Sequence, residues 1–228
     1  MDKIKQMLLM QQNLNDATSG KDWEKGLTDK GKIIDWKRCV LLESAELINS
    51  YPWKHWKNIK AQPDFENIKI EVVDIWHFVM SEALRVFKIE NLGDIEQLSN
   101  EIKKLPTFPV FKQKKNKQVH IDIYEQIKSI EYMIKVLFTS KDVLQLLDAF
   151  FAMASDLNLY LDELYNLYIG KNILNQFRQN NGYKEGSYKK VWGEVEDNVV
   201  MQNILAENIN ITPDNLYKKL ENLYKYNN

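Results

Sequence analysis

Residues 33–50, IIDWKRCVLLESAELINS, and residues 67–87, NIKIEVVDIWHFVMSEALRVF, are the stretches that decide the fold of this chain. Neither contains glycine or proline, and both are rich in leucine, isoleucine and valine. Their apolar residues follow helical spacing and cover most of each circumference, which is typical of buried helices. We therefore expect two long helices that pack as a hairpin, the first of them ended by Pro52.

The remaining sequence predicts more helices. The chain has only 8 glycines and 5 prolines among 228 residues, so long segments run without a helix breaker. Alternating strand patterns are absent, and we expect an all-α, multi-helix bundle that forms a single domain over residues 1–228. The further helices are expected at residues 4–15, 121–138, 141–181 with room for one break, 192–205, and from 212 onward.

Punctuating residues predict where these helices begin and end. Gly20 is expected to end the first helix, Gly182 to provide a left-handed C-terminal cap, and Thr212 to cap the start of the last helix. Residues 105–118 contain two prolines and a lysine run, which makes them the expected loop or lobe boundary. The lysines of this run are Lys112, Lys114, Lys115 and Lys117.

Composition excludes several classes of protein. The formal net charge of −1 favours neither nucleic acid nor a membrane surface as a partner. The single cysteine, Cys39, excludes an internal disulfide and a zinc site built on cysteines. No apolar run reaches the roughly 18 residues of a membrane span, and residues 1–15 do not resemble a secretory signal. We expect a cytoplasmic protein.

Acidic side chains stand inside both apolar helices. Glu43 and Glu46 are three residues apart in the first, and Glu71 and Asp74 are three apart in the second, so each pair shares a face. No Lys or Arg stands three or four residues after any of them. Carboxylates buried together without a cation would be forced to take up protons, whereas oxygen ligands suit Mg²⁺ or Mn²⁺. The alternative is that the acids are partly exposed and paired with basic residues elsewhere.

A basic stripe stands late in the chain. Lys171, Asn175 and Arg178 occupy positions i, i+4 and i+7 of a predicted helix, which places two cations and an amide in one row. A glycine-containing loop follows with three more lysines: Lys184, Lys189 and Lys190. Such a loop can fold over phosphates, which arginine binds in a bidentate manner. The alternative is a solvated helix end whose cations complement the helix dipole.

The acidic pattern resembles a known metal-binding signature. Glu43-Ser44-Ala45-Glu46 followed by Glu71-Val72-Val73-Asp74 is similar to the ExxE and ExxD motifs of the all-α nucleotide pyrophosphatases, which include MazG-type enzymes and the dimeric dUTPases. The flanking segments resemble the dimeric dUTPases: Gln11 to Asn15, Asp35-Trp36, residues 51–57, His77-Phe78, residues 171–188 and residues 196–198. The resemblance covers residues 11–78 and 165–198. Gln12-Asn13 departs from it, since aspartate is expected after Gln11.

This resemblance implies a dUTP pyrophosphatase that hydrolyses dUTP, and also dUDP, to dUMP and so supplies dUMP for thymidylate synthesis. Mg²⁺, or Mn²⁺, is expected on Glu43, Glu46, Glu71 and Asp74. Glu46 is the first candidate for the general base, with Glu43 as the second catalytic acid. The resemblance also implies a homodimer and a set of phosphate-binding cations: Lys171, Arg178, Lys184 and Lys190.

The expected nucleoside contacts are Gln11, Asn15, Trp53, His77, Phe78, Asn175 and Tyr183. Gln11 and Asn15 are four residues apart on one face, and their amides suit the alternating donors and acceptors of uracil. The alternatives are two exposed polar residues for this pair, a structural histidine for His77, and core packing for Trp53 and Phe78. Three other tryptophans are expected in the core: Trp36, Trp76 and Trp192.

Two other functions fit parts of this pattern. A broad-specificity nucleoside triphosphate pyrophosphatase of the MazG type needs the four acids but not the uracil and phosphate residues. A non-catalytic helical interaction protein needs neither. Comparable activity on several bases would favour the first, and failure to bind Mg²⁺ or any nucleotide would favour the second.

Overall fold

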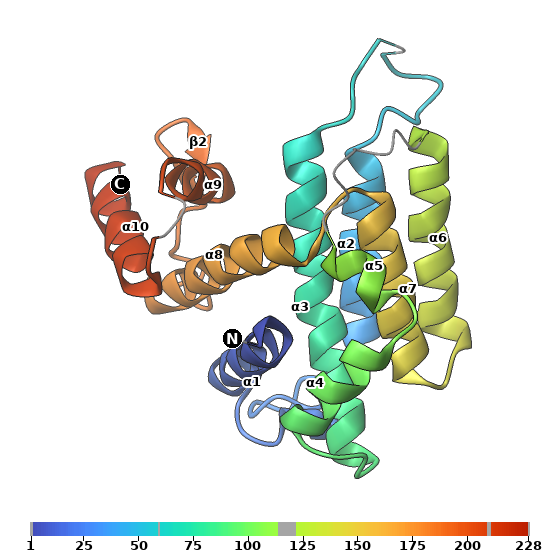
Figure 1. Ribbon diagram of the computed structural model, residues 1–228. Coiled ribbons are helices and arrows are strands. Elements are labelled where there is room, and N and C mark those ends of the chain that lie inside the picture. Colours follow the sequence, from blue (N-terminus) through green and yellow to red (C-terminus); the bar gives the residue numbers. More distant parts are fainter. Residues whose placement is uncertain (1, 59, 114–121, 209–210, 228) are drawn as a thin grey trace. The chain divides into compact units, whose positions relative to one another are not determined.

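The computed structural model describes residues 2–58, 60–113, 122–208 and 211–227, which form an all-α fold with one small hairpin (Figure 1). The predicted fold class is therefore confirmed. The chain divides into two compact units, Met1–Leu164 and Tyr165–Asn228. The prediction of a single domain over residues 1–228 stays a prediction.

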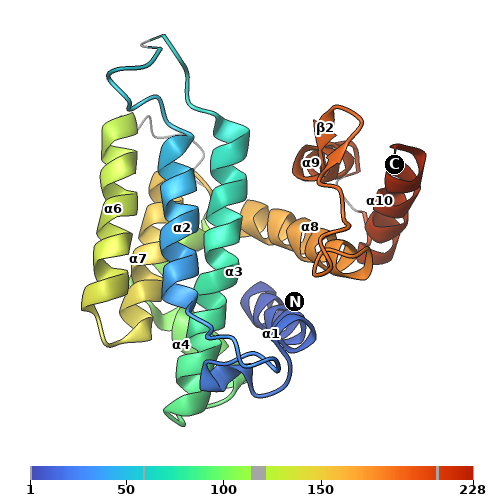
Figure 2. The same cartoon turned by 180° about the vertical axis from the view of Figure 1, so that it is seen from behind.

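The first unit consists of helices. They are α1 (Lys3–Ser19), the short 3₁₀-helix η1 (Trp23–Lys25), α2 (Trp36–Asn49), α3 (Phe65–Ile89), α4 (Ile95–Lys104), α5 (Phe108–Lys112), α6 (Ile123–Thr139) and α7 (Val143–Asp156). The apolar stretches 33–50 and 67–87 correspond to α2 and α3, which run side by side as a hairpin (Figure 2).

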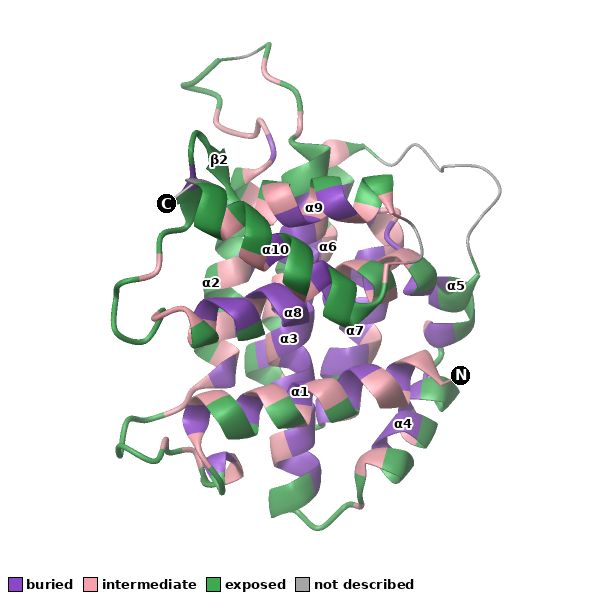
Figure 3. Ribbon diagram, turned by 90° about the vertical axis from the view of Figure 1, so that its left-hand side faces the viewer, coloured by how far each residue is buried: buried purple, intermediate pink, exposed green. Residues whose placement is uncertain are grey.

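Helix α3 is the centre of the first unit. It packs against α1, α2, α4 and α7, and the parts of it visible in Figure 3 are mostly buried. Trp76 of α3 stacks on Phe150 of α7, with ring centroids 4.8 Å apart and an interplanar angle of 20°. Phe151 lies beside both rings, and all three side chains are fully buried. Such aromatic contacts stabilise the fold beyond the area they bury.

Helix α2 is less buried than its sequence predicts. Trp36, Val40 and Leu47 are buried as expected, but Leu41 and Leu42 are 37% and 57% exposed. The expectation of a helix buried all round was therefore wrong. The physical reason is that α2 packs against α3 and α6 through one side, so apolar residues on its other side reach solvent.

Side-chain caps explain where the helices begin. Asp35 accepts a hydrogen bond from Arg38 N at 2.9 Å at the start of α2, and Asp64 accepts one from Asn67 N at 3.0 Å at the start of α3. Aspartate is a preferred N-cap because its carboxylate satisfies a free backbone N–H group there. Helix α4 was not predicted, although its capping box, made by Asp94 and Gln97, is a recognisable sequence signal.

The expected loop at residues 105–118 contains the short helix α5, which ends at Lys112. The rest of the lysine run, Lys114, Lys115 and Lys117, lies outside the described residues. Gly20 does cap α1 as predicted, with its N–H donating to Asp16 O.

The second unit contains most of α8 (Leu161–Asn180), the strands β1 (Val191–Trp192) and β2 (Val195–Glu196), α9 (Asp197–Glu207) and α10 (Pro213–Asn227). The hairpin corrects the predicted helix at 192–205, which begins only at Asp197. Gly193 (φ +65°) allows the chain to turn there, so Trp192 pairs with Val195 instead of entering a helix.

Gly182 (φ +87°) follows α8 in the predicted left-handed conformation. Thr212 Oγ1 accepts from Asn215 N at 3.4 Å at the start of α10. Within the described residues, no helix combines the length and apolar character needed to cross a membrane.

Candidate active site

The α2–α3 hairpin is closed at the end that carries the acids. Asp64 N donates to Ser50 O at 2.9 Å, and Asn67 Nδ2 donates to Ser50 Oγ at 2.8 Å. These bonds join the C-terminal end of α2 to the first turn of α3 and so set the register between the two helices. They bring Glu71 of the second acid pair beside the first pair.

Three of the predicted acids meet across this hairpin. Glu43, Glu46 and Glu71 each offer a carboxylate oxygen, and these atoms lie within 4.8 Å of one another. Glu71 is buried, Glu43 is half-buried and Glu46 is exposed, so the expectation of four buried carboxylates was wrong in this respect. Asp74 is half-buried one turn further along α3 and is not one of the three.

The chemistry of these donors fits a hard divalent cation. Three carboxylates at this separation repel one another in the absence of a cation, and Mg²⁺ and Mn²⁺ prefer oxygen ligands. Glu71 Oε1 also accepts a hydrogen bond from Asn67 Nδ2 at 3.1 Å, which orients that carboxylate. Hydrogen bonds of this kind orient metal ligands in proteins. The acidic group could thus bind a metal ion.

A pocket of about 670 Å³ adjoins the acidic group, and both Glu46 and Glu71 line it. Its size lies within the range of small-molecule sites. Tyr51 also contributes to its wall, and burial raises the pKa of the Tyr51 hydroxyl well above its ordinary value. This hydroxyl is therefore protonated at neutral pH and can donate a hydrogen bond.

Further along α3 from Glu71, a cluster of buried polar side chains joins this helix to α1. Gln11 Nε2 donates to Asn15 Oδ1 at 2.9 Å and to Ser81 Oγ at 3.1 Å. Asn15 Nδ2 donates to Ser81 Oγ at 3.0 Å, and His77 Nδ1 lies 2.6 Å from Gln11 Oε1. All four side chains are at most 4% exposed, which excludes the alternative of two exposed polar residues for Gln11 and Asn15. Ser81 was not predicted as part of this cluster, although it is a small polar residue one helical turn after His77.

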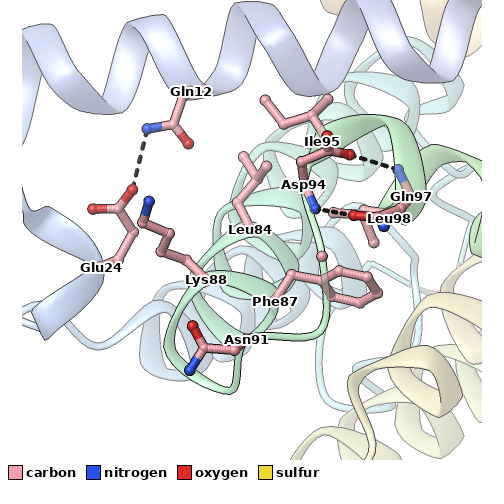
Figure 4. Close-up of a pocket in the computed structure, with 11 residues that line it drawn as sticks. Gln12, Glu24, Leu84, Phe87, Lys88, Asn91, Asp94, Ile95, Gln97 and Leu98 are labelled. Carbon is pink, nitrogen blue, oxygen red and sulfur yellow. Dashed lines mark hydrogen bonds between the residues drawn. The ribbon is translucent and has the colours of Figure 1, made fainter.

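The residue that departs from the expected first motif lies on another side of α1. Gln12 Nε2 donates to Glu24 Oε1 at 3.3 Å at the edge of a separate pocket between α1, η1 and the α3–α4 turn (Figure 4). That pocket is lined by Lys88 and Asn91, and none of the predicted site residues contributes to it. The hydrogen bonds of the Gln12 side chain, to Asp16 and Glu24, thus lie outside the polar cluster around Gln11.

The predicted aromatic contacts have partners of their own. Phe78 stacks on Trp36, with ring centroids 5.9 Å apart and an interplanar angle of 24°. The rings of Trp53 and Trp56 make an edge-to-face contact, with centroids 5.6 Å apart. Lys54 Nζ lies 5.7 Å from the centroid of the Trp53 ring. Phe78 and Trp53 are only half-buried, so both retain accessible surface. Trp36, Trp76 and Trp192 are buried as predicted.

The basic stripe of α8 is held by α9 within the second unit. Arg178 forms two hydrogen bonds with Asp197, and its Nη1 reaches Asn175 Oδ1 at 3.2 Å. Lys171 Nζ donates to Asn198 Oδ1 at 2.9 Å. Lys171 and Arg178 are 3% and 8% exposed, which excludes the solvated helix end for these two cations.

The loop after α8 carries the other predicted contacts. Lys190 Nζ lies 5.6 Å from the centroid of the Tyr183 ring, whereas Lys184 is exposed. Tyr188 donates its hydroxyl to Asp197 Oδ2 at 2.8 Å, and burial together with this carboxylate raises the pKa of that hydroxyl. The structuring role of Asp197 was missed, because sequence spacing does not reveal which acid a buried arginine will meet.

Comparison with known proteins bears on this arrangement. A protein-family model described as dUTPase matches residues 3–183, which is most of the chain and includes the acidic group, the polar cluster and the α8 stripe. No curated protein gives a significant match. Because the matched region spans well over half of the chain and contains both clusters of the first unit, the protein belongs to the dUTPase family and is a dUTP diphosphatase.

Proposed function

We propose that the protein hydrolyses dUTP to dUMP and pyrophosphate with Mg²⁺, or Mn²⁺, on its acidic group, accepts dUDP as well, and so supplies dUMP for thymidylate synthesis. The observation that carries this proposal is the placement of two clusters on one helix. Glu71 belongs to the acidic group. His77, six residues later on α3, belongs to the buried polar cluster. Six residues correspond to about 9 Å along a helix axis. One helix therefore contributes to both the acidic group and the buried polar cluster.

Glu43, Glu46, Glu71 and Asp74 are the proposed metal ligands. A bound Mg²⁺ would neutralise phosphate charge. Glu46 is the proposed general base, because it is the most exposed member of the group and lines the adjoining pocket, where a water molecule can enter. Asn67 holds the Glu71 carboxylate in place, and Glu43 supports the acidic group from α2.

Gln11, Asn15 and His77 are the proposed uracil contacts, with Trp53 and Phe78 at the nucleoside. Amide and imidazole groups provide both hydrogen-bond donors and acceptors, which a base-selective site requires. A site built from buried hydrogen-bonding groups rejects a ligand that leaves them unpaired far more strongly than an apolar pocket does. The buried cluster thus favours selectivity for one base over the broad specificity of a MazG-type enzyme.

The phosphate contacts are proposed for the second unit. Its basic residues are Lys171, Arg178, Lys184 and Lys190, with Asn175 and Tyr183 beside them. Arg178 is pre-oriented by Asp197, which lowers the entropy that would be lost when a planar guanidinium binds a phosphate. Lys184 and Lys190 are exposed, so their charges are accessible to a phosphate.

A homodimer is the proposed assembly. Leu41 and Leu42 leave apolar surface exposed on α2, the helix that carries Glu43 and Glu46. Burial of these two side chains against a second copy of the chain would remove apolar surface from water, which is favourable. Sedimentation equilibrium of the wild type and of Leu42→Lys tests this. We expect a dimer whose dissociation constant rises in the variant, and a wild-type monomer would contradict the assembly.

The activity is tested by pyrophosphate release with Mg²⁺ from dUTP beside UTP, dTTP, dCTP and dATP. We expect strong preference for dUTP and loss of all turnover after chelation. Equal turnover of the five nucleotides would retain the acidic group and reject the uracil contacts. Absence of turnover with every nucleotide, in a protein that is folded and supplied with Mg²⁺ and Mn²⁺, would reject the proposed reaction.

A further inference from the structure

Ser81 lies at the centre of the buried cluster and is fully buried on α3. Its Oγ is 3.1 Å from Gln11 Nε2, 3.0 Å from Asn15 Nδ2, 3.4 Å from Asn15 Oδ1 and 2.8 Å from the His77 carbonyl oxygen. A hydroxyl group has one proton and two lone pairs. The shortest acceptor contact, 2.8 Å to the His77 carbonyl, takes the proton, because a contact of 3.4 Å is much weaker.

The lone pairs of Ser81 then accept from the two amides. This assignment orients Gln11 and Asn15 so that each turns its NH₂ group toward Ser81. The other proton of Gln11 Nε2 goes to Asn15 Oδ1 at 2.9 Å. Gln11 Oε1 can only accept, so His77 Nδ1 must donate to it across 2.6 Å. His77 is thereby held in the tautomer protonated on Nδ1, which leaves Nε2 as an acceptor.

Asn15 retains hydrogen-bonding capacity in this arrangement. Within the described part of the chain, Nδ2 uses one of its two protons on Ser81, and Oδ1 accepts one bond from Gln11. One N–H and one oxygen lone pair of Asn15 therefore remain, in fixed positions. The remaining N–H can donate to a carbonyl oxygen of uracil at the position where cytosine carries its 4-amino group.

Rotation of the Asn15 amide by 180° would place its oxygen where this N–H stood, and an acceptor there complements the 4-amino group of cytosine instead. In the flipped state Asn15 Oδ1 would face Ser81 Oγ, whose proton is already donated to His77. Asn15 Nδ2 would face Gln11 Nε2, so that two donors would oppose each other. A buried donor or acceptor left unsatisfied is costly, and the network therefore opposes the flip.

We propose that Ser81 is a specificity-determining positioning residue, which selects uracil over cytosine by fixing the amide orientation of Asn15 and, through Gln11, the tautomer of His77. The proposal rests on the proposed function in that it takes this cluster as the base-binding site. Ser81 itself acts through its neighbours and need not touch the nucleotide.

The test compares kcat/KM for dUTP and dCTP in the wild type, Ser81→Ala and Ser155→Ala. Ser155 is the matched control, because its Oγ makes the same bond to the carbonyl four residues earlier, Phe151 O at 2.8 Å, in a helix away from the cluster. We expect the dUTP to dCTP ratio to fall at least tenfold in Ser81→Ala and to stay within twofold in Ser155→Ala. Mn²⁺ affinity should be unchanged in both. A folded Ser81→Ala variant with an unchanged ratio would overturn the proposal.

A second measurement keeps the proposal testable if Ser81→Ala does not fold. Long-range ¹H–¹⁵N spectra of the wild type report which nitrogen of His77 is protonated, and the chain has only 3 histidines to assign. We expect protonation on Nδ1 at a pH at which the ring is neutral. Protonation on Nε2 would overturn the network, whatever the activity. If the wild type shows no preference for dUTP while His77 is protonated on Nδ1, the base-binding role of the cluster fails together with the selectivity assigned to Ser81, whereas the hydrogen-bond network stands.

Discussion

The Arg178 guanidinium donates two hydrogen bonds to the Asp197 carboxylate, from Nε to Oδ2 at 2.8 Å and from Nη2 to Oδ1 at 2.7 Å. The side chains are 9% and 1% exposed, so this bidentate pair is desolvated and joins α8 to α9. A buried pair of this kind is sensitive to the loss of one partner, because the other charge then stays buried without compensation.

Arg178→Ala should therefore lower the free energy of unfolding by about 3 kcal/mol. Urea denaturation of the full chain, followed by tryptophan fluorescence, measures this change because Trp192 lies in the same unit. Lys184→Ala removes an exposed cation from the neighbouring loop and should leave the midpoint unchanged. Equal midpoints for the two variants would show that the Arg178–Asp197 pair contributes little to stability.

Glu46→Gln should lower kcat for dUTP by at least about 100-fold, since a general base contributes on that order. Glu46 is exposed, so its amide should be accommodated without loss of the melting temperature. The control is Glu90→Gln, an exposed glutamate at the C-terminal end of α3. Wild-type kcat in Glu46→Gln would remove Glu46 from the mechanism.

Variants of the proposed metal ligands should bind Mn²⁺ more weakly than a variant of a nearby acid that is not a ligand. Titration with Mn²⁺, followed by electron paramagnetic resonance, should show at least about tenfold weaker binding in Glu43→Gln, Glu71→Gln and Asp74→Asn, a loss typical even of outer-shell partners. Asp64→Asn is the matched control, because Asp64 lines the same pocket and asparagine also caps helices well. An unchanged affinity in Asp74→Asn alone would limit the site to the three acids that meet in the structure.

Asn67→Ala should weaken Mn²⁺ binding by about tenfold. The variant removes the bond to Glu71 Oε1 at 3.1 Å and the bond to Ser50 Oγ at 2.8 Å, while the backbone cap from Asp64 stays in place. Asn100→Ala, on the exposed side of α4, provides the comparison for a helical asparagine without such contacts. Identical affinities in both variants would mean that Glu71 needs no support from Asn67.

Gly182→Ala should destabilise the loop after α8 more than Gly186→Ala does. Both glycines have positive φ, +87° and +73°, so alanine is strained at either position. Only at Gly182 would the added Cβ meet a neighbour, Ser187 Oγ, which donates to Gly182 O at 3.2 Å. Losing that bond should cost about 1 kcal/mol more, and thermal unfolding of the two variants measures the difference. Equal melting temperatures would contradict this account.

Local signals predicted most of the helices correctly. The continuous apolar stretches of α2 and α3, Gly20 after α1 and Thr212 before α10 act through neighbours in the sequence, and the structure confirms each of them. The hairpin at Trp192 was not predicted, because its strands have two residues each and leave no alternating pattern to detect.

Long-range contacts set the limit of prediction within the candidate site. The spacing of Glu43 and Glu46 places both on one face of a helix, but spacing alone does not reveal that Glu71 joins them while Asp74 lies outside the group. That outcome depends on the register of α2 against α3, which the bonds from Asp64 and Asn67 to Ser50 establish.

The sequence by itself determined most of the helices, some of their caps, the paired carboxylates and the motifs that resemble the dUTPases, because each of these depends on residues close together along the chain. The tertiary structure decided which side of α2 is buried, which acids meet, and that Ser81 holds amides 66 and 70 residues away. It also decided that Arg178 is paired with Asp197 across 19 residues. These outcomes depend on how helix faces pack, and packing brings together residues whose separation in the sequence carries no record of their contact.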